Sequence, residues 1–138
     1  MKKIFLVLLC VLSIHGLFAQ QPNAKVLQAL SNSEIAKLQP AQVDYLNFLS
    51  ENLVIISSMP EKAVGLVDFS TIRRKDGKVT DMKTLDLNQF NPLLFVIPIQ
   101  KDKVTAYKFG DTGKVITVLS QDRLDVLYER YKSNNAKK

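Results

Sequence analysis

After residue 20, apolar residues recur every three or four positions, as they do on one face of a helix. Val26 and Leu30 predict a helix over 24–31, and a second, short helix is expected over 34–38. The polar residues 31–33 between them favour a helix boundary, because Ser and Asn side chains accept hydrogen bonds from unpaired backbone amides. This part of the chain is therefore predicted to be helical.

Pro40 predicts the start of a longer helix. Proline suits the first helical position, because its missing amide hydrogen would have no partner there. A broad apolar face that includes Tyr45, Leu46 and Phe48 supports a helix over 40–51.

The spacing changes at Leu53, where apolar and β-branched residues follow one another directly. Such short runs, bounded by turn residues, predict strands. Asp76 and Gly77 predict a hairpin turn, since glycine adopts the positive φ that such turns require. Further turns are expected at 100–103 and 110–113. The expected strands cover 53–56, 66–73, 78–87, 93–99, 104–109 and 114–119, with 93–99 at the centre of the sheet.

The last element is predicted to be a helix. Ser120 is its expected N-cap, and Asp122 lies in its first turn, where the helix dipole favours negative charge. Leu124, Tyr128 and Tyr131 belong to an apolar stripe at spacings of three and four. The order of elements predicts an α+β domain with N-terminal helices, an antiparallel β-meander of about five to six strands, and a C-terminal helix packed on the sheet.

The N-terminal residues have the pattern of a secretory signal peptide. A basic start, Lys2 and Lys3, precedes an apolar run over 4–14 and a small residue, Ala19. The run is shorter than the roughly 20 residues that span a bilayer, so no transmembrane anchor is expected. We expect cleavage after Ala19, or alternatively after Gln20. The protein would then be periplasmic or secreted, as one domain over 20–138 with a polar leader (20–24) and a frayed tail (132–138).

This prediction restricts the chemistry of the chain. The single histidine, His15, and the single cysteine, Cys10, both lie in the expected signal, and the chain has no tryptophan. Cleavage would therefore remove the side chains used by His or Cys metal sites and by Ser-His-Asp or Cys-His catalysis. Residues 110–114 lack the spacing of a phosphate-binding loop. We expect no catalytic residue, no cofactor and no metal site. A hydrolase built on carboxylates needs neither histidine nor cysteine, so the loss of these two residues does not exclude it.

The charge of the chain is mildly basic. The net charge is +6, and without Lys2 and Lys3 it becomes +4, with 17 Lys and Arg against 13 Asp and Glu. No basic motif with interleaved aromatic residues is present, so nucleic acid is not an expected partner. One basic group does stand out, because Arg73, Arg74, Lys75 and Lys78 surround the Asp76–Gly77 turn. It is either a solvated loop tip or a contact for lipid phosphate or an acidic partner.

A second candidate surface lies on the sheet. Alternation along strand 104–109 places Tyr107 and Phe109 on one face, and Leu94 lies in the neighbouring apolar run. These residues either pack as core beneath helices or form an open apolar face that binds a partner. The sequence therefore favours a small exported, non-enzymatic envelope protein that acts by binding, with another protein as the expected partner. The alternative is a binder of a small apolar or glycan ligand in a sheet-helix cleft, and a carboxylate-based hydrolase is the third choice.

Overall fold

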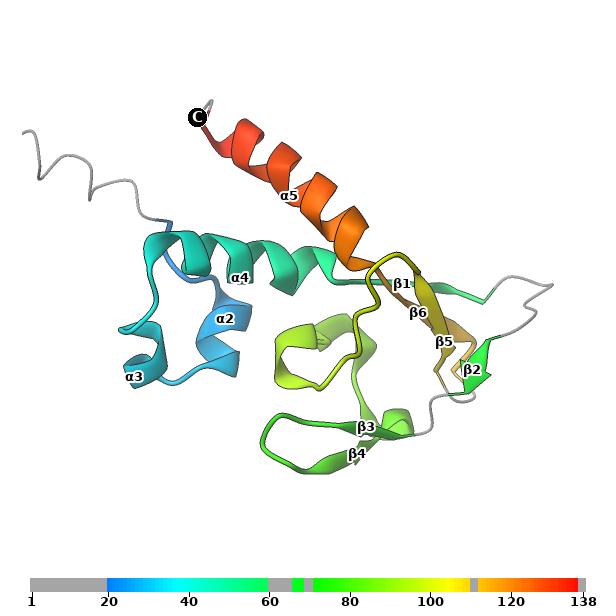
Figure 1. The fold of residues 1–138 in the computed structure, drawn as a ribbon. Coiled ribbons are helices and arrows are strands. Elements are labelled where there is room, and N and C mark those ends of the chain that lie inside the picture. The colour runs from blue at the N-terminus through cyan, green and yellow to red at the C-terminus, as the bar shows by residue number, and fades with distance from the viewer. Residues whose placement is uncertain (1–19, 60–65, 69–70, 110–111, 137–138) are drawn as a thin grey trace, which may run out of the picture.

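The computed structural model describes residues 20–59, 66–68, 71–109 and 112–136. The expected signal peptide, with Cys10 and His15, lies outside the described residues, as do parts of the expected strand 66–73 and of the turn 110–113. Within the described ranges, helices and antiparallel strands combine in one fold (Figure 1), which confirms the predicted α+β class.

The helices lie close to the predicted positions. Their bounds are α2 Ala24–Ala29, α3 Asn32–Ile35, α4 Pro40–Asn52 and α5 Gln121–Asn135. Local chemistry sets their starts. The Ser31 hydroxyl accepts a hydrogen bond from the Glu34 amide, and the Glu34 carboxylate accepts one from the Ser31 amide, which forms a capping box. Ser120 caps α5 in the predicted way. Helix α5 continues to Asn135, into the segment expected to be tail.

The strands form two sheets. Their bounds are β1 Val54–Ser58, β2 Val67–Asp68, β3 Thr71–Arg73, β4 Val79–Asp81, β5 Thr105–Lys108 and β6 Lys114–Val118. The larger sheet has the order β1-β6-β5-β2, in which β6 pairs antiparallel with both β1 and β5, whereas the short β2 runs parallel to β5. Strands β3 and β4 form a separate antiparallel hairpin. At its turn Gly77 has a φ of +85°, as the Asp-Gly signal predicts.

The prediction of a central strand over 93–99 is wrong. A short 3-10 helix, Pro92–Leu94, occupies its start, because the Asn91 side chain accepts a hydrogen bond from the Leu93 amide. Only Phe95 pairs in a β-bridge, with Arg74. Pro98 has no amide hydrogen to donate to a ladder. The central positions of the larger sheet belong to β6 and β5.

The expected strand 78–87 is also shorter than predicted. Strand β4 ends at Asp81, whose carboxylate accepts a hydrogen bond from the Lys83 amide and turns the chain into a 3-10 helix, Met82–Thr84. A second 3-10 helix, Leu87–Gln89, follows.

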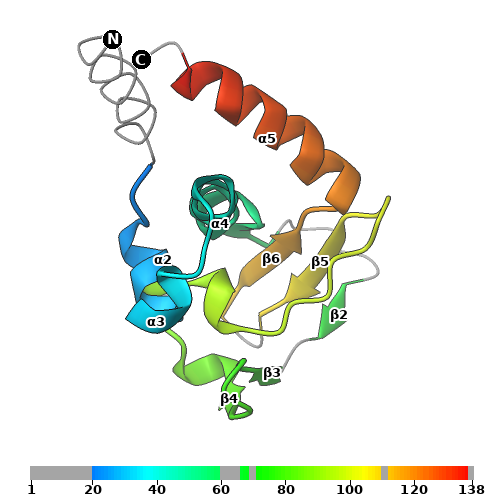
Figure 2. The same ribbon diagram turned by 60° about the vertical axis from the view of Figure 1, so that its left-hand side comes forward.

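The hydrophobic core lies between the larger sheet, the helices and the irregular segment around Phe90 and Phe95. Its fully buried side chains include Phe48 of α4, Phe109 after β5 and Leu124 of α5. In both ribbon views the β3–β4 hairpin lies at the end of the molecule opposite α5 (Figures 1 and 2).

Candidate functional site

The residues that the sequence placed on a possible open sheet face belong to the core. Phe109 is 0% exposed, and Tyr107 and Leu94 are half-buried and pack against the core cluster. Tyr107 pairs in register with Ile116, which is buried on the same face of the sheet. The packed alternative is therefore the observed one for this face, and the three side chains do not form an exposed docking surface.

A small cavity does adjoin Tyr107, but it does not have the size of a ligand site. Its volume is about 10 Å³. A space of this size holds at most about one water molecule. Its walls are apolar and come from Ile72, Phe90, Ile97, Pro98, Tyr107, Ile116 and Val118. The sheet-helix cleft expected for a glycan or an apolar ligand is thus filled by side chains at this point.

A much larger depression lies between α4 and α5, and we call it the α4–α5 groove. Its volume is about 560 Å³, within the range of about 300–1,000 Å³ that is typical of binding pockets. It is open to solvent rather than enclosed. The lining side chains come from the N-terminal half of α4, the C-terminal half of α5 and the residue Leu38, and they are Leu38, Ala41, Gln42, Tyr45, Leu46, Tyr128 and Lys132.

Strand pairing positions the two helices that form the groove. Helix α4 leads directly into β1 and β6 leads into α5, and β1 pairs antiparallel with β6 from Val54 opposite Val118. The Leu119 amide donates a hydrogen bond to the Leu53 carbonyl, 3.1 Å away, and extends this ladder to the helix ends. The helices therefore meet beside the sheet and diverge toward the start of α4 and the end of α5 (Figure 1).

Both tyrosine side chains of the groove are held by contacts of the aromatic ring and by a hydrogen bond of the hydroxyl group. The rings of Tyr45 and Tyr128 meet edge to face with centroids 4.9 Å apart, and Tyr128 also packs on Phe48 at 5.2 Å. The Tyr45 hydroxyl accepts a hydrogen bond from Gln121 Nε2, 3.3 Å away, and the Tyr128 hydroxyl donates one of 3.5 Å to the Ala41 carbonyl. Because the hydroxyls bond to the protein, aromatic carbon is what remains to line the groove.

Lys132 is the one charged side chain among the described residues that line the groove. Lys132 Nζ lies 2.7 Å from Glu129 Oε1 and 5.0 Å from the centroid of the Tyr128 ring. The hydrogen bond to Glu129 raises the pKa of Lys132, so the ammonium stays charged. Burial, and then the nearby Asp44 carboxylate, raise the pKa of Tyr128 and keep its hydroxyl neutral. No carboxylate is among the described side chains that line the groove, so a carboxylate pair for hydrolysis is not found there.

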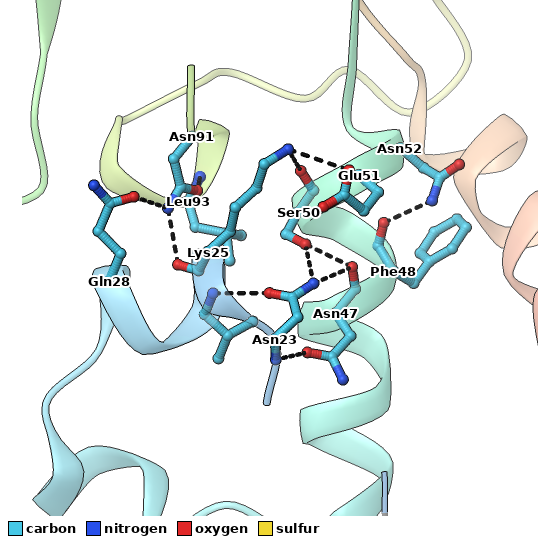
Figure 3. A network of polar contacts seen from close by, with 11 residues as sticks. Asn23, Lys25, Gln28, Asn47, Phe48, Ser50, Glu51, Asn52, Asn91 and Leu93 are labelled. Carbon is cyan, nitrogen blue, oxygen red and sulfur yellow. Dashed lines mark hydrogen bonds and ion pairs between the residues drawn. The ribbon is translucent and has the colours of Figure 1, made fainter. Parts of the chain in front are cut away.

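A network of buried polar side chains lies on the other side of α4 and serves a structural role (Figure 3). The Asn47 carboxamide accepts a hydrogen bond from the Asn23 amide and donates one to the Gln21 carbonyl, at 2.8 and 2.9 Å. Asn91 Nδ2 donates to the Lys25 carbonyl, 2.8 Å away. These bonds attach the start of the described chain to α4 and to the segment before Pro92. The expected polar leader is therefore anchored up to Ala24, where α2 begins.

The basic residues predicted to be a contact point divide into two groups. Arg74 is half-buried, pairs with Asp76 at 3.2 Å and lies over the Phe95 ring at 5.7 Å, so its guanidinium has protein partners. Arg73, Lys75 and Lys78 are exposed at the hairpin. The structure thus keeps these three residues as surface candidates and gives Arg74 a structural role.

Sequence reasoning missed the α4–α5 groove. The spacing of apolar residues placed Tyr45 and Tyr128 on the apolar faces of two helices. Spacing alone does not show whether such a side chain is fully buried or partly exposed. Across the described ranges no cluster of three His, Cys, Asp or Glu could hold a metal ion, and no helix is long and apolar enough to cross a membrane. Comparisons of the chain with protein family models, with characterised proteins and with solved structures give no match.

Proposed function

We propose that this protein is an exported, non-enzymatic envelope protein that binds another protein through the α4–α5 groove. The observation that carries the proposal is the groove itself, about 560 Å³ in volume, with aromatic and aliphatic walls and one charged lining residue, Lys132. Apolar surface gathered in a depression is typical of a binding site, because its burial by a partner is favourable.

The openness of the groove favours a protein over a small ligand. Small-molecule sites bury about 70–90% of their ligand, which an open depression between two diverging helices does not do. A segment of another protein covers such a groove from outside and excludes water with its own bulk.

The lining residues indicate the chemistry of the partner segment. Tyr45, Leu46 and Tyr128 would contact apolar side chains, and Lys132 would meet a carboxylate beside them. We therefore expect an amphipathic segment with apolar residues spaced along one face and an acidic residue near the end of α5. The Lys132 charge is shared with Glu129 and is exposed, so it would contribute orientation more than affinity.

Photo-crosslinking in cells tests the proposal. A benzoylphenylalanine introduced at Gln42, an exposed lining residue, should form an adduct with one protein. Ala41→Lys should remove the adduct, because the long charged side chain fills the groove, while lysine remains a good helix former. Peptide sequencing of the adduct should show the amphipathic segment.

The matched control is Ala24→Lys, which adds the same side chain at an exposed helical position on α2, away from the groove. It should leave the adduct unchanged. An adduct that survives Ala41→Lys, or an adduct only of small-molecule mass, would refute the protein-binding proposal, and the second result would favour the apolar or glycan ligand instead.

Export is a separate part of the proposal and has its own test. The basic start, the apolar run 4–14 and Ala19 support it. N-terminal sequencing of the protein recovered from the periplasm or medium should begin at Gln20, or at Gln21 if the alternative site is used. Recovery of the protein only in the cytoplasm with Met1 or Lys2 at its N-terminus would contradict export.

A further inference from the structure

We propose that the tip of the β3–β4 hairpin docks on an anionic lipid surface through Arg73, Lys75 and Lys78. This inference concerns a second surface and does not depend on the α4–α5 groove. We call residues 73–79 the basic tip.

The hairpin is one of the two most basic segments of the chain. Residues 71–83 contain five Lys and Arg against two Asp, a net of +3, whereas residues 20–138 as a whole have a net of +4. A second basic segment, residues 130–138, holds four Lys and Arg and no Asp or Glu, and its Lys132 pairs with Glu129 at 2.7 Å. A concentrated field of one sign attracts a surface of the opposite sign more strongly than the same charge spread over the domain.

Contacts within the basic tip leave three cations for a partner. Asp76 is the only carboxylate of the tip, and Arg74 pairs with it at 3.2 Å. A hydrogen bond from the Lys78 amide, and then the Arg74 side chain, lower the pKa of Asp76. Arg73, Lys75 and Lys78 are exposed, and none of them forms a salt bridge with another residue of the described ranges.

The basic tip is also ordered before any partner arrives. Gly77, with its positive φ, donates a hydrogen bond to the Arg74 carbonyl, and the Arg74 amide donates one of 2.7 Å to the Lys78 carbonyl. The Lys75 amide donates to the Leu94 carbonyl, 2.9 Å away, which attaches the tip to the domain. The backbone would thus lose little conformational entropy on docking.

Two features favour a lipid surface over an acidic protein. Val79 lies opposite Arg73 in the β3–β4 register and is 61% exposed, so an apolar side chain accompanies the cations on the outer face of the hairpin. Apolar side chains beside Lys and Arg are typical of segments that lie at a membrane interface. The tip also lies at the end of the molecule opposite α5 (Figure 2), where a planar surface could approach it.

Vesicle sedimentation tests this inference on the full chain purified from cells, with its N-terminus determined by mass spectrometry. The protein should bind phosphatidylcholine vesicles that contain phosphatidylglycerol and should bind pure phosphatidylcholine weakly. Replacing Arg73, Lys75 and Lys78 together by Gln should lower the partition coefficient roughly 100-fold, as expected for three basic residues near an anionic surface. Val79→Asn should lower it by roughly threefold.

The matched control replaces Lys37, Lys101 and Lys103 by Gln, since all three are exposed and lie outside the hairpin. It removes the same charge. It should lower the partition coefficient by less than about tenfold, compared with roughly 100-fold for the variant of the basic tip. Equal losses in the two triple variants would overturn the inference, because they would show attraction by net charge alone. Displacement of the protein from vesicles by polyglutamate or by inorganic phosphate at matched anion concentration would also overturn it, in favour of an acidic polypeptide or a free phosphate.

Discussion

Replacing Phe109 by alanine is expected to lower the free energy of unfolding by about 3–5 kcal/mol. The side chain is 0% exposed and belongs to the main core cluster, so its removal leaves a cavity between the sheet and the helices. Urea denaturation followed by circular dichroism measures the change. A loss of this size is a large part of the stability of an ordinary domain, so the variant is measured at low temperature.

The control for this prediction is Val79→Ala, which shortens an apolar side chain that is 61% exposed. It should change the free energy of unfolding by less than about 0.5 kcal/mol. If Phe109→Ala were as mild as Val79→Ala, Phe109 would not be a core residue, and the hypothesis that it forms part of an exposed apolar face would have to be restored.

The second large effect is expected at Asn47. Asn47→Ala should destabilise the protein by about 2–4 kcal/mol, because it leaves the Asn23 amide and the Gln21 carbonyl without their partners in a partly buried environment. The first turn of α2 depends on the same attachment, since Asn23 is its N-cap. Hydrogen exchange should therefore accelerate at the amides of α2 more than at those of β6.

Asn88→Ala is the matched control, because Asn88 is exposed in a 3-10 helix. It should alter neither the midpoint of denaturation nor the exchange of α2. Uniform acceleration of exchange over the whole domain in Asn47→Ala would contradict a local anchoring role, since it would show that α2 unfolds only together with the core.

The two proposed surfaces lie at different ends of the molecule, which makes them separable by experiment. The α4–α5 groove is bounded by helices, whereas the basic tip is at the far end of the β3–β4 hairpin (Figures 1 and 2). Ala41→Lys should therefore leave vesicle binding intact, and the triple Gln variant of the tip should leave the crosslink at Gln42 intact. A protein with both properties would hold its partner beside a membrane surface.

Local chemistry could be predicted from the sequence alone. The Pro40 helix start, the Ser120 cap and the Asp76–Gly77 turn depend on residues within one or two turns of each other, and all three are present. Tyr107 and Phe109, two residues apart, also pack on the same core cluster, as the strand period of two predicts. These features need no knowledge of what lies across the core.

The tertiary structure decided which apolar segments became strands and which apolar surface remained open. The run 93–99 has the composition of a buried strand, but only Leu93 and Phe95 of it are buried, Val96, Pro98 and Ile99 are exposed, and the 3-10 helix after Asn91 replaces the start of a ladder. Likewise, the groove exists because β1 pairs with β6 and brings together helices that are about seventy residues apart in the chain. An apolar pattern determines that a side chain avoids water, whereas its partner depends on long-range pairing, which the period of a single segment does not encode.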